Sequence, residues 1–189
     1  MSQLRTVEGR STRPTSAQTA CDPGVPPDAD EFRQFMSNWP TGVSVVTSRH
    51  GGVPVGCTVN AIMSVSLSPP LLAVSLCRTS GTLSTIQQSG AFALNVLCAD
   101  QRDLCGRFAN GDQSERFQGV PVRHHRGMPV LTDALATALC AIHDTVDCGD
   151  HVLVVGMPVW QHIRPDVGPP LIFHDHHLLG LPDTGTSEG

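Results

Sequence analysis

Hydrophobic and polar residues alternate along most of the chain with the period of two that is typical of β-strands. In residues 61–68, "AIMSVSLS", three serines alternate with Val65 and Leu67, which predicts a strand with one buried face. Residues 42–59, "GVSVVTSRHGGVPVGCTV", predict two strands joined at a His-Gly-Gly turn. Residues 136–163 predict one long hairpin that turns around Cys-Gly-Asp.

Three short stretches have the signals of helices instead. Apolar residues recur at helical spacing between Phe32 and Trp39, after a possible cap at Asp28 or Asp30. The segment "TLSTIQQSG" predicts a helix that Gly90 closes, and "DQRDLCGRFANG" predicts another for which Asp100 is a plausible cap. The stretch between this helix and the long hairpin reads as irregular, and "PLIFH" as a final strand.

The expected fold is therefore mainly β, with seven or eight strands in sequential hairpins. Such a meander favours a closed or half-closed antiparallel barrel, because closure protects the edges of the sheet. The βαβαβ alternation of a doubly wound fold and the G-x-G-x-x-G motif are both missing from the sequence. A nucleotide would have to bind without a Rossmann site.

Length and composition predict one domain with disordered ends. Residues 1–27 are rich in Ser, Thr, Pro and Gln and are expected to form a disordered arm. Residues 28–180 are expected to form the folded domain, and residues 181–189 a flexible tail. The sequence has no apolar run long enough to span a membrane and no signal-peptide core. The seven cysteines include no C-x-x-C pair, which favours free thiols and a cytoplasmic location.

Charge narrows the possible chemistry. The net charge is -5, which argues against nucleic acid as a partner. All 12 positive residues are arginines, so a P-loop lysine and a Schiff-base lysine are both excluded. A small anionic ligand needs only a few local donors and remains possible.

Four groups of residues could carry a function. Ser80, Gly81 and Thr82 begin a helix where free N–H groups, with Arg78 nearby, could hold a phosphate, although Ser80 could equally act only as a cap. Gly56, Thr58 and Asn60 could lie against a planar ligand, or belong to a polar surface strand. His151 follows a rigid turn and could position a ligand, or be an ordinary turn residue. His174 and His176 would share a strand face, which makes them a possible metal pair.

Four segments, in their order and spacing, resemble the short-chain flavin reductases. They are "FMSNWPTGVSVVT", "VPVGCTVNAIMSVSLSPPLLAVSL", "SGAFALNVLCADQRDLCGRFA" and "GDHVLVVG". These reductases are the small components of two-component flavin-dependent monooxygenases. The resemblance implies an FMN-binding split β-barrel and a homodimer. It also implies reduction of free FAD or FMN by NADH or NADPH, with the reduced flavin passing to a partner monooxygenase.

The resemblance also implies a set of site residues. One edge of the flavin would be Pro54, Val55, Gly56, Cys57, Thr58, Asn60 and Ala61, a second edge Ser75, Leu76 and Cys77, and the phosphate cradle Ser80, Gly81 and Thr82. Arg107 would contact phosphates. Asp150 and His151 would lie on the nicotinamide side. His151 would be the catalytic residue, acting by positioning the nicotinamide and not by proton transfer. Two alternatives stay open: a flavin electron carrier of the same fold, and a metal-binding barrel that uses His174 and His176.

Overall fold

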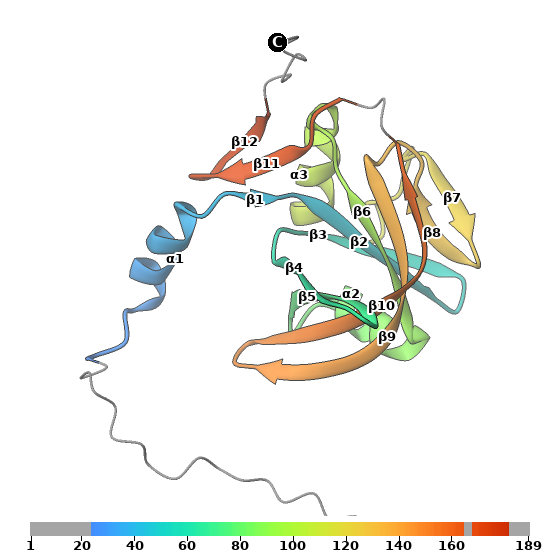
Figure 1. Ribbon diagram of the computed structural model, residues 1–189. Coiled ribbons are helices and arrows are strands. Elements are labelled where there is room, and N and C mark those ends of the chain that lie inside the picture. The colour runs from blue at the N-terminus through green and yellow to red at the C-terminus, as the bar shows by residue number, and fades with distance from the viewer. Residues whose placement is uncertain (1–23, 165–167, 182–189) are drawn as a thin grey trace, which may run out of the picture.

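The main body of the molecule is one antiparallel sheet of seven strands. The computed structural model describes residues 24–164 and 168–181. Along the sheet the strand order is β3-β2-β6-β9-β10-β5-β4 (Figure 1). The bounds are β2 Ser44–His50, β3 Val53–Val59, β4 Ile62–Leu67, β5 Pro70–Cys77, β6 Ala91–Val96, β9 Ala136–Cys148 and β10 His151–Ile163. The expectation of a mainly β, antiparallel fold is confirmed.

Two smaller sheets flank this body. Strands β1 (Thr41–Gly42), β11 (Leu171–His174) and β12 (His177–Gly180) form one, and β7 (Val122–His125) with β8 (Met128–Leu131) forms the other. Every pairing in the three sheets is antiparallel. The β7–β8 hairpin lies in the stretch for which the sequence predicts irregular structure, so that prediction was wrong.

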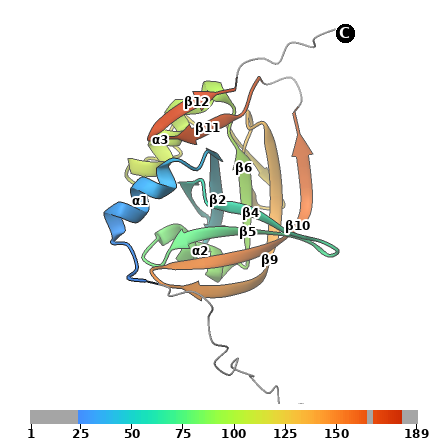
Figure 2. The same ribbon diagram turned by 60° about the vertical axis from the view of Figure 1, so that its left-hand side comes forward.

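The seven-stranded sheet curls so that its two edges meet at a corner. Strands β3 and β4 are consecutive in the chain but lie at opposite edges of the sheet, and only Asn60 and Ala61 join them. The curling brings β4 and β5 across β2 and β6 (Figure 2). At the corner the Ser75 backbone N–H donates to the Ala61 carbonyl at 3.0 Å. The barrel is therefore split and half-closed, because β3 and β4 do not pair with each other in the described residues.

Both predicted hairpins are confirmed. The β2–β3 turn is Gly51-Gly52, with φ of 58° and 90°, values that a two-residue type I′ turn requires and glycine adopts at little cost. Strands β9 and β10 are 13 residues each and turn at Gly149-Asp150. This long hairpin extends beyond both of its neighbours in the sheet, so its two ends lie on opposite sides of the molecule (Figure 1).

The three helices form where the sequence predicts them. Helix α1 (Ala29–Ser37) begins at Asp28, whose carboxylate accepts from the Glu31 N–H in a capping box. Helix α2 (Gly81–Ser89) begins at the cap Ser80 and ends at Gly90, whose φ is 72°.

The proposed cap of the third helix was wrong. Asp100 lies inside a 3₁₀ turn, Ala99–Gln101, and helix α3 runs from Arg102 to Asn110 with Gln101 in the cap position. No side-chain hydrogen bond caps this end. A short 3₁₀ turn leads directly into the helix instead.

The burial of two apolar side chains of β4 differs from the prediction. Val65 and Leu67, expected to be buried, are 46% and 90% exposed. The pairing of β4 with β5 shifts register between Ser64 and Ser66, and β4 is an edge strand. The period-2 pattern therefore identifies the strand correctly, but an edge strand with a bulge need not bury its apolar face.

Two large hydrophobic clusters and a small third one hold the described part of the fold together. The larger lies inside the barrel, among β2, β5, β6, β10 and α2, and includes Phe92 and Ile86, both fully buried. A Cβ added at Gly156 would lie 2.6 Å from the Phe92 ring, so this glycine makes room for the aromatic side chain. The second cluster joins β2 to α3 through Val45, Phe108 and neighbours.

One buried amide connects the sheet to β8. Asn95 is fully buried; its Nδ2 donates to the Val45 carbonyl at 3.0 Å, and its Oδ1 accepts from the Leu131 N–H at 2.9 Å. The Thr47 hydroxyl, also buried, donates to the Pro129 carbonyl at 2.5 Å. These contacts attach the β7–β8 hairpin to the outside of β2 and β6.

Replacing Asn95 by Leu should lower the free energy of unfolding by about 2–4 kcal/mol, because the Leu131 N–H and the Val45 carbonyl would remain buried without their side-chain partner. Urea unfolding measures the loss. The matched control is Asn110→Leu, at an exposed position at the end of α3. A loss for Asn95→Leu no greater than for Asn110→Leu would contradict this role.

Candidate functional site

A cavity of about 260 Å³ opens at the corner where the two edges of the sheet meet. Most of the residues predicted for the flavin line it. They are Cys57, Thr58, Asn60 and Ala61 from β3 and the corner, Ser75, Leu76 and Cys77 from β5, then Ser80 and His151. We call this cavity the corner groove.

Strand register explains why distant segments meet at the groove. Cys77 of β5 pairs with His151 of β10, so the end of one strand lies beside the beginning of the other. The hydrogen bond from Ser75 to Ala61 places the corner against the same stretch of β5. The groove is thus built on backbone that two strands and a tight turn hold rigidly.

A second cavity, of about 550 Å³, continues the site on the other side of the α2 N-terminus. Pro54, Val55 and Gly81 line it, together with Gln113 and Phe117. Ser80 lines the corner groove and Gly81 the second cavity, so the beginning of α2 separates the two. The first N–H groups of a helix have no acceptors within the helix, and the helix dipole favours an anion there.

The thiol of Cys57 lies against the beginning of α2. Burial raises the pKa of this thiol, while hydrogen bonds with Thr82 and Ser80 and the charge of Arg116 act in the opposite direction. The thiol is therefore protonated at neutral pH. It presents a small neutral wall to the groove rather than a nucleophile.

Core packing explains why a glycine stands at position 56 and what the hydroxyl at position 58 contacts. A Cβ added at Gly56 would lie 2.9 Å from the Phe108 ring and 3.0 Å from the Val46 carbonyl. Glycine is thus required here by the packing of α3 on β3, whatever lies in the groove. The Thr58 hydroxyl donates to the Cys105 carbonyl at 2.7 Å, which attaches β3 to the same helix.

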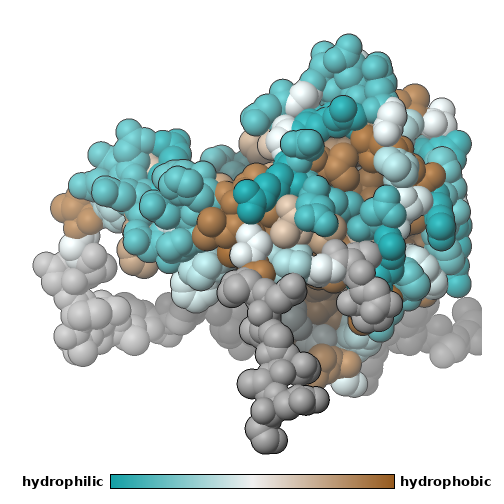
Figure 3. All heavy atoms as spheres, turned by 90° about the horizontal axis from the view of Figure 1, so that it is seen from above, coloured by the Kyte–Doolittle hydropathy of each residue, from teal (hydrophilic) through white to brown (hydrophobic). Residues whose placement is uncertain are grey.

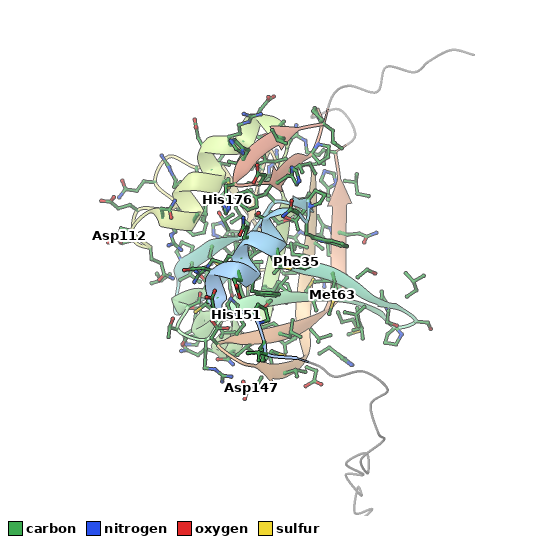
Figure 4. All side chains as sticks on the ribbon, turned by 90° about the vertical axis from the view of Figure 1, so that its left-hand side faces the viewer. Phe35, Met63, Asp112, Asp147, His151 and His176 are labelled. Carbon is green, nitrogen blue, oxygen red and sulfur yellow. The ribbon has the colours of Figure 1, made fainter. Side chains whose placement is uncertain are left out.

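His151 stands at the mouth of the groove, at the beginning of β10 (Figure 4). Its Nδ1 lies 2.8 Å from Asp150 Oδ1. This hydrogen bond and the charge of His151 hold the pKa of the Asp150 carboxyl below its ordinary value, so the carboxylate persists at neutral pH. The imidazole is therefore oriented by its neighbour, and its Nε2 is left for a ligand.

Arg78 does not face the α2 N-terminus as a phosphate ligand would. Its guanidinium donates to Asp147 Oδ1 at 2.9 Å and to the Gly149 carbonyl at 3.0 Å. Its backbone N–H donates to the Asp150 carbonyl at 2.9 Å. The arginine joins β5 to the β9–β10 turn and so fixes the position of His151.

Four predicted site residues lie outside both cavities, and one of them is Gly56, which packs against α3. Thr82 is buried beneath the α2 N-terminus, where it meets Cys57, and Asp150 acts through His151. Arg107 lines another cavity, of about 530 Å³, and its Nη1 donates to the Gln118 carbonyl at 2.5 Å. A role for Arg107 in phosphate binding stays a prediction.

The proposed metal pair does not form as expected. Strand β11 ends at His174, and His176 lies in the following turn with a left-handed φ of 61°. The two imidazoles therefore do not share a strand face. Within residues 24–164 and 168–181, no three His, Cys, Asp or Glu side chains gather in a way that could hold a metal ion.

Sequence reasoning missed the segment 111–120 as part of the site. A Cβ added at Gly81 would lie 2.7 Å from Gln113 Oε1, so the Gln113 side chain lies against the beginning of α2. Arg116 Nη1 donates to the Gly56 carbonyl at 2.6 Å, and its Nε to the Gly111 carbonyl at 2.9 Å. The segment has no periodic pattern, so only the tertiary fold brings it to the site.

The fold and the groove together define a class of protein: a split-barrel protein with a groove at the sheet corner, beside a helix N-terminus, and no Rossmann motif in its sequence. The chain belongs to the flavin reductase family, because residues 36–182 match the model of the Flavin reductase like domain. It is accordingly an oxidoreductase that reduces flavin with a nicotinamide nucleotide.

Relatives and solved structures agree with this family. The chain is 36% identical over 155 residues to an actinorhodin polyketide dimerase of Streptomyces coelicolor, covering 82% of this chain and 87% of the relative. It is 38% identical over 168 residues to an NADH-dependent FMN reductase, AsuE2, of Streptomyces nodosus subsp. asukaensis, covering 86% and 90%. It is 34% identical over 149 residues to the reductase component of a 4-nitrophenol monooxygenase of Rhodococcus opacus, covering 79% of each chain. The structure of flavin reductase PheA2 superposes with a TM-score of 0.76 at 36% identity, covering 82% and 99%.

The thiols of the groove should differ in reactivity. Cys77 is exposed, and hydrogen bonds with Thr79 lower the pKa of its thiol, whereas burial raises the pKa values of Cys57 and Cys105. Iodoacetamide should therefore alkylate Cys77 before Cys57 and Cys105, and at pH values below the ordinary thiol pKa of about 8.5. Peptide mass spectrometry measures the order.

The control for this experiment is Thr79→Val, which removes the hydrogen bond that lowers the pKa of Cys77. It should slow alkylation of Cys77 at neutral pH and leave the rate at high pH unchanged. Equal rates for both proteins at neutral pH would show that the hydrogen bond has no such effect.

Proposed function

We propose that this flavin reductase binds FAD or FMN as a free substrate in the corner groove, reduces it with NADH or NADPH, and releases the reduced flavin to a partner monooxygenase. The observation that carries the proposal is the meeting of three elements around one groove. These are the strand segment 57–61, the α2 N-terminus and His151 at the mouth.

The groove offers each part of a flavin a suitable surface. The flat isoalloxazine ring would lie along residues 57–61 and against Ser75 to Cys77 of β5. The phosphate would lie at the beginning of α2, where the Gly81 backbone N–H has no acceptor within the helix, whereas the Ser80 N–H donates to the Cys77 carbonyl at 2.9 Å. The neutral Cys57 thiol at this point adds no negative charge that would repel a phosphate.

The reaction requires that the nicotinamide and flavin rings be aligned, and it requires no general acid or base. A hydride moves from the reduced nicotinamide to the flavin ring, and the protein's task is to hold the two rings stacked at about 3–3.5 Å. Backbone N–H groups of the groove would stabilise the negative charge that the flavin ring gains. The rigid pairing of β5 with β10 supports such alignment, because it fixes both walls of the groove.

His151 is assigned to the nicotinamide side. The Asp150 carboxylate orients its ring, and Arg78 holds the turn from which it projects. We therefore assign His151 to positioning the nicotinamide ring through its Nε2, and Asp150 to holding His151.

We also propose that the protein works as a homodimer in the cytoplasm. Helix α1 projects from the body and presents Phe32, Phe35 and Met36 to solvent, and Trp39 follows just after the helix; Phe35 and Trp39 are 71% and 68% exposed. In the view of Figure 3 it forms the lobe at the left, with hydrophobic residues at its edge. The exposed Met63, Val65 and Leu67 of β4 add a second apolar surface, and Figure 4 looks onto this side. A second copy of the chain would bury both surfaces.

The cytoplasmic location rests on the cysteines and on the nature of the donor. The six cysteines in the described residues are all unpaired, which suits a reducing compartment where nicotinamide nucleotides are available. The described residues contain no helix that is long and apolar enough to cross a membrane.

The experiment that tests the function is NADH oxidation by the purified protein with FAD, with FMN and without flavin. Many turnovers should occur only with added flavin, since flavin is a substrate that leaves after each cycle. Under anaerobic conditions the yellow colour of the added flavin should bleach. A repeat with NADPH determines which nucleotide is preferred.

The same experiment distinguishes a flavin reductase from the alternative, a flavin electron carrier. A flavin electron carrier of this fold would arrive yellow, and added flavin would not change its rate. A colourless protein that oxidises neither nucleotide with either flavin would contradict both functions.

Replacing His151 by Ala should raise the KM for NADH by about tenfold, because a hydrogen bond to the bound nucleotide is lost, and should lower kcat less. Steady-state kinetics with saturating flavin measure both constants. The matched control is His143→Ala, an exposed histidine on β9 outside the groove, which should leave both unchanged. If His151→Ala instead lowered kcat by several orders of magnitude and changed its pH profile, His151 would be an acid–base catalyst.

A further inference from the structure

A cavity of about 390 Å³ lies at the end of the molecule that the flavin site does not use. Its walls are the β7–β8 hairpin and the last part of β10. From His151 to Trp160 the chain advances nine residues along β10, which is about 30 Å of extended strand. In Figure 1 the β9–β10 turn and the β7–β8 hairpin lie on opposite sides. We call this cavity the β7–β8 pocket.

One wall of the pocket is a stack of aromatic rings. The imidazole of His125 lies on the indole of Trp160, with ring centroids 4.0 Å apart and planes 20° apart. His162, two residues further along β10, lies on the same strand face, with its ring centroid 6.1 Å from that of Trp160 and a plane angle of 15°. Flat, nearly parallel rings form a surface on which another flat ring can lie.

The floor is apolar and the walls carry positive charge. Val130, Leu131 and Ala134 are buried at the floor. Arg123 and Arg164 line the walls, and Arg164 is paired with Asp133 at 3.0 Å and donates to the Thr132 carbonyl at 2.9 Å. The guanidinium of Arg123 has no such partner among the described residues, so its five donors remain for a ligand.

A buried donor or acceptor is also left without a partner. The Nε2 of His125 is shielded from solvent and makes no hydrogen bond within residues 24–164 and 168–181. Such an atom costs free energy unless something pairs with it. Together with the free guanidinium of Arg123, it gives the pocket two polar groups that lack ligands, beside a flat aromatic wall.

The pocket is rigid before anything binds. Strand β8 is attached to the sheet through the Leu131 N–H to Asn95 and the Pro129 carbonyl to Thr47. Trp160 packs on the buried cluster of Ala93, Val130 and Leu139. A site whose walls are already fixed loses little conformational entropy when a ligand enters.

We propose that the β7–β8 pocket is a second ligand site, separate from the flavin site, that binds a small planar aromatic carboxylate. The carboxylate would accept hydrogen bonds from the Arg123 guanidinium, in the bidentate geometry that arginine favours. The ring would lie on the Trp160 and His125 stack, above the apolar floor. An inorganic anion would use the charge but neither the ring stack nor the floor, and this is why the aromatic acid is the better fit.

The test is a binding titration that does not involve flavin or NADH, so its result is independent of the proposed function. The protein contains two tryptophans, and Trp39→Phe leaves Trp160 as the only one. Its fluorescence is followed while benzoate, benzamide, cyclohexanecarboxylate or inorganic phosphate is added, and calorimetry repeats the titrations. Benzoate should give saturable binding. Benzamide, which lacks the charge, and cyclohexanecarboxylate, which lacks the flat ring, should each bind at least about tenfold more weakly.

The variant that tests the contact is Arg123→Gln, which should weaken benzoate binding by about tenfold or more. The matched control is Arg126→Asn, which removes a charge from the turn of the same hairpin but outside the pocket. Asparagine tolerates the left-handed φ of 49° at that position. Affinity for benzoate should be unchanged in this control, and circular dichroism should show that both variants are folded.

Three results would overturn the proposal. The first is no binding of benzoate at concentrations up to about 10 mM. The second is equal binding of benzamide, or an equal effect of Arg123→Gln and Arg126→Asn, since the carboxylate would then have no specific partner. The third is displacement of benzoate by an equal concentration of phosphate, which would make the pocket a general anion site.

Discussion

The closing of the sheet at Asn60–Ala61 is the constraint on which the rest of the structure depends. Because two consecutive strands lie at opposite edges of one sheet, the chain must turn sharply between them, and the edges meet without pairing. Backbone groups that a closed barrel would pair remain available at this seam. The groove in which we propose that flavin binds lies at this seam between the two edge strands.

Paired strands and two arginine side chains hold that seam in place. Strand β5 brings Ser75 to the corner and Cys77 to His151, while Arg78 continues from the same strand to the β9–β10 turn. Arg116 joins the irregular segment 111–120 to β3 at Gly56. The groove is therefore held by backbone hydrogen bonds between strands and by the side chains of Arg78 and Arg116, and the Thr58 hydroxyl attaches its β3 wall to α3.

The sequence predicted the elements whose signals are local. The glycine turns at 51–52 and 149, the caps Asp28 and Ser80, and the period-2 strands are all visible in short windows. The resemblance to a family then predicted which residues would lie at the flavin site. What the sequence did not reveal depends on tertiary contacts: Gln113 against Gly81, and the aromatic stack of His125 on Trp160. The exposure of Leu67 was mispredicted for a related reason, because edge position is a property of the whole sheet.

The buried amide of Asn95 also joins parts of the chain that are far apart in the sequence. Its Oδ1 accepts from the Leu131 N–H and its Nδ2 donates to the Val45 carbonyl, so one side chain of β6 holds β8 and β2 together. Strand β8 thus lies on a part of the sheet where Asn95 and Val45 are paired across two strands. A substitution at Asn95 removes contacts of three strands at once, so this position tolerates change far less than the exposed residues of the β7–β8 hairpin.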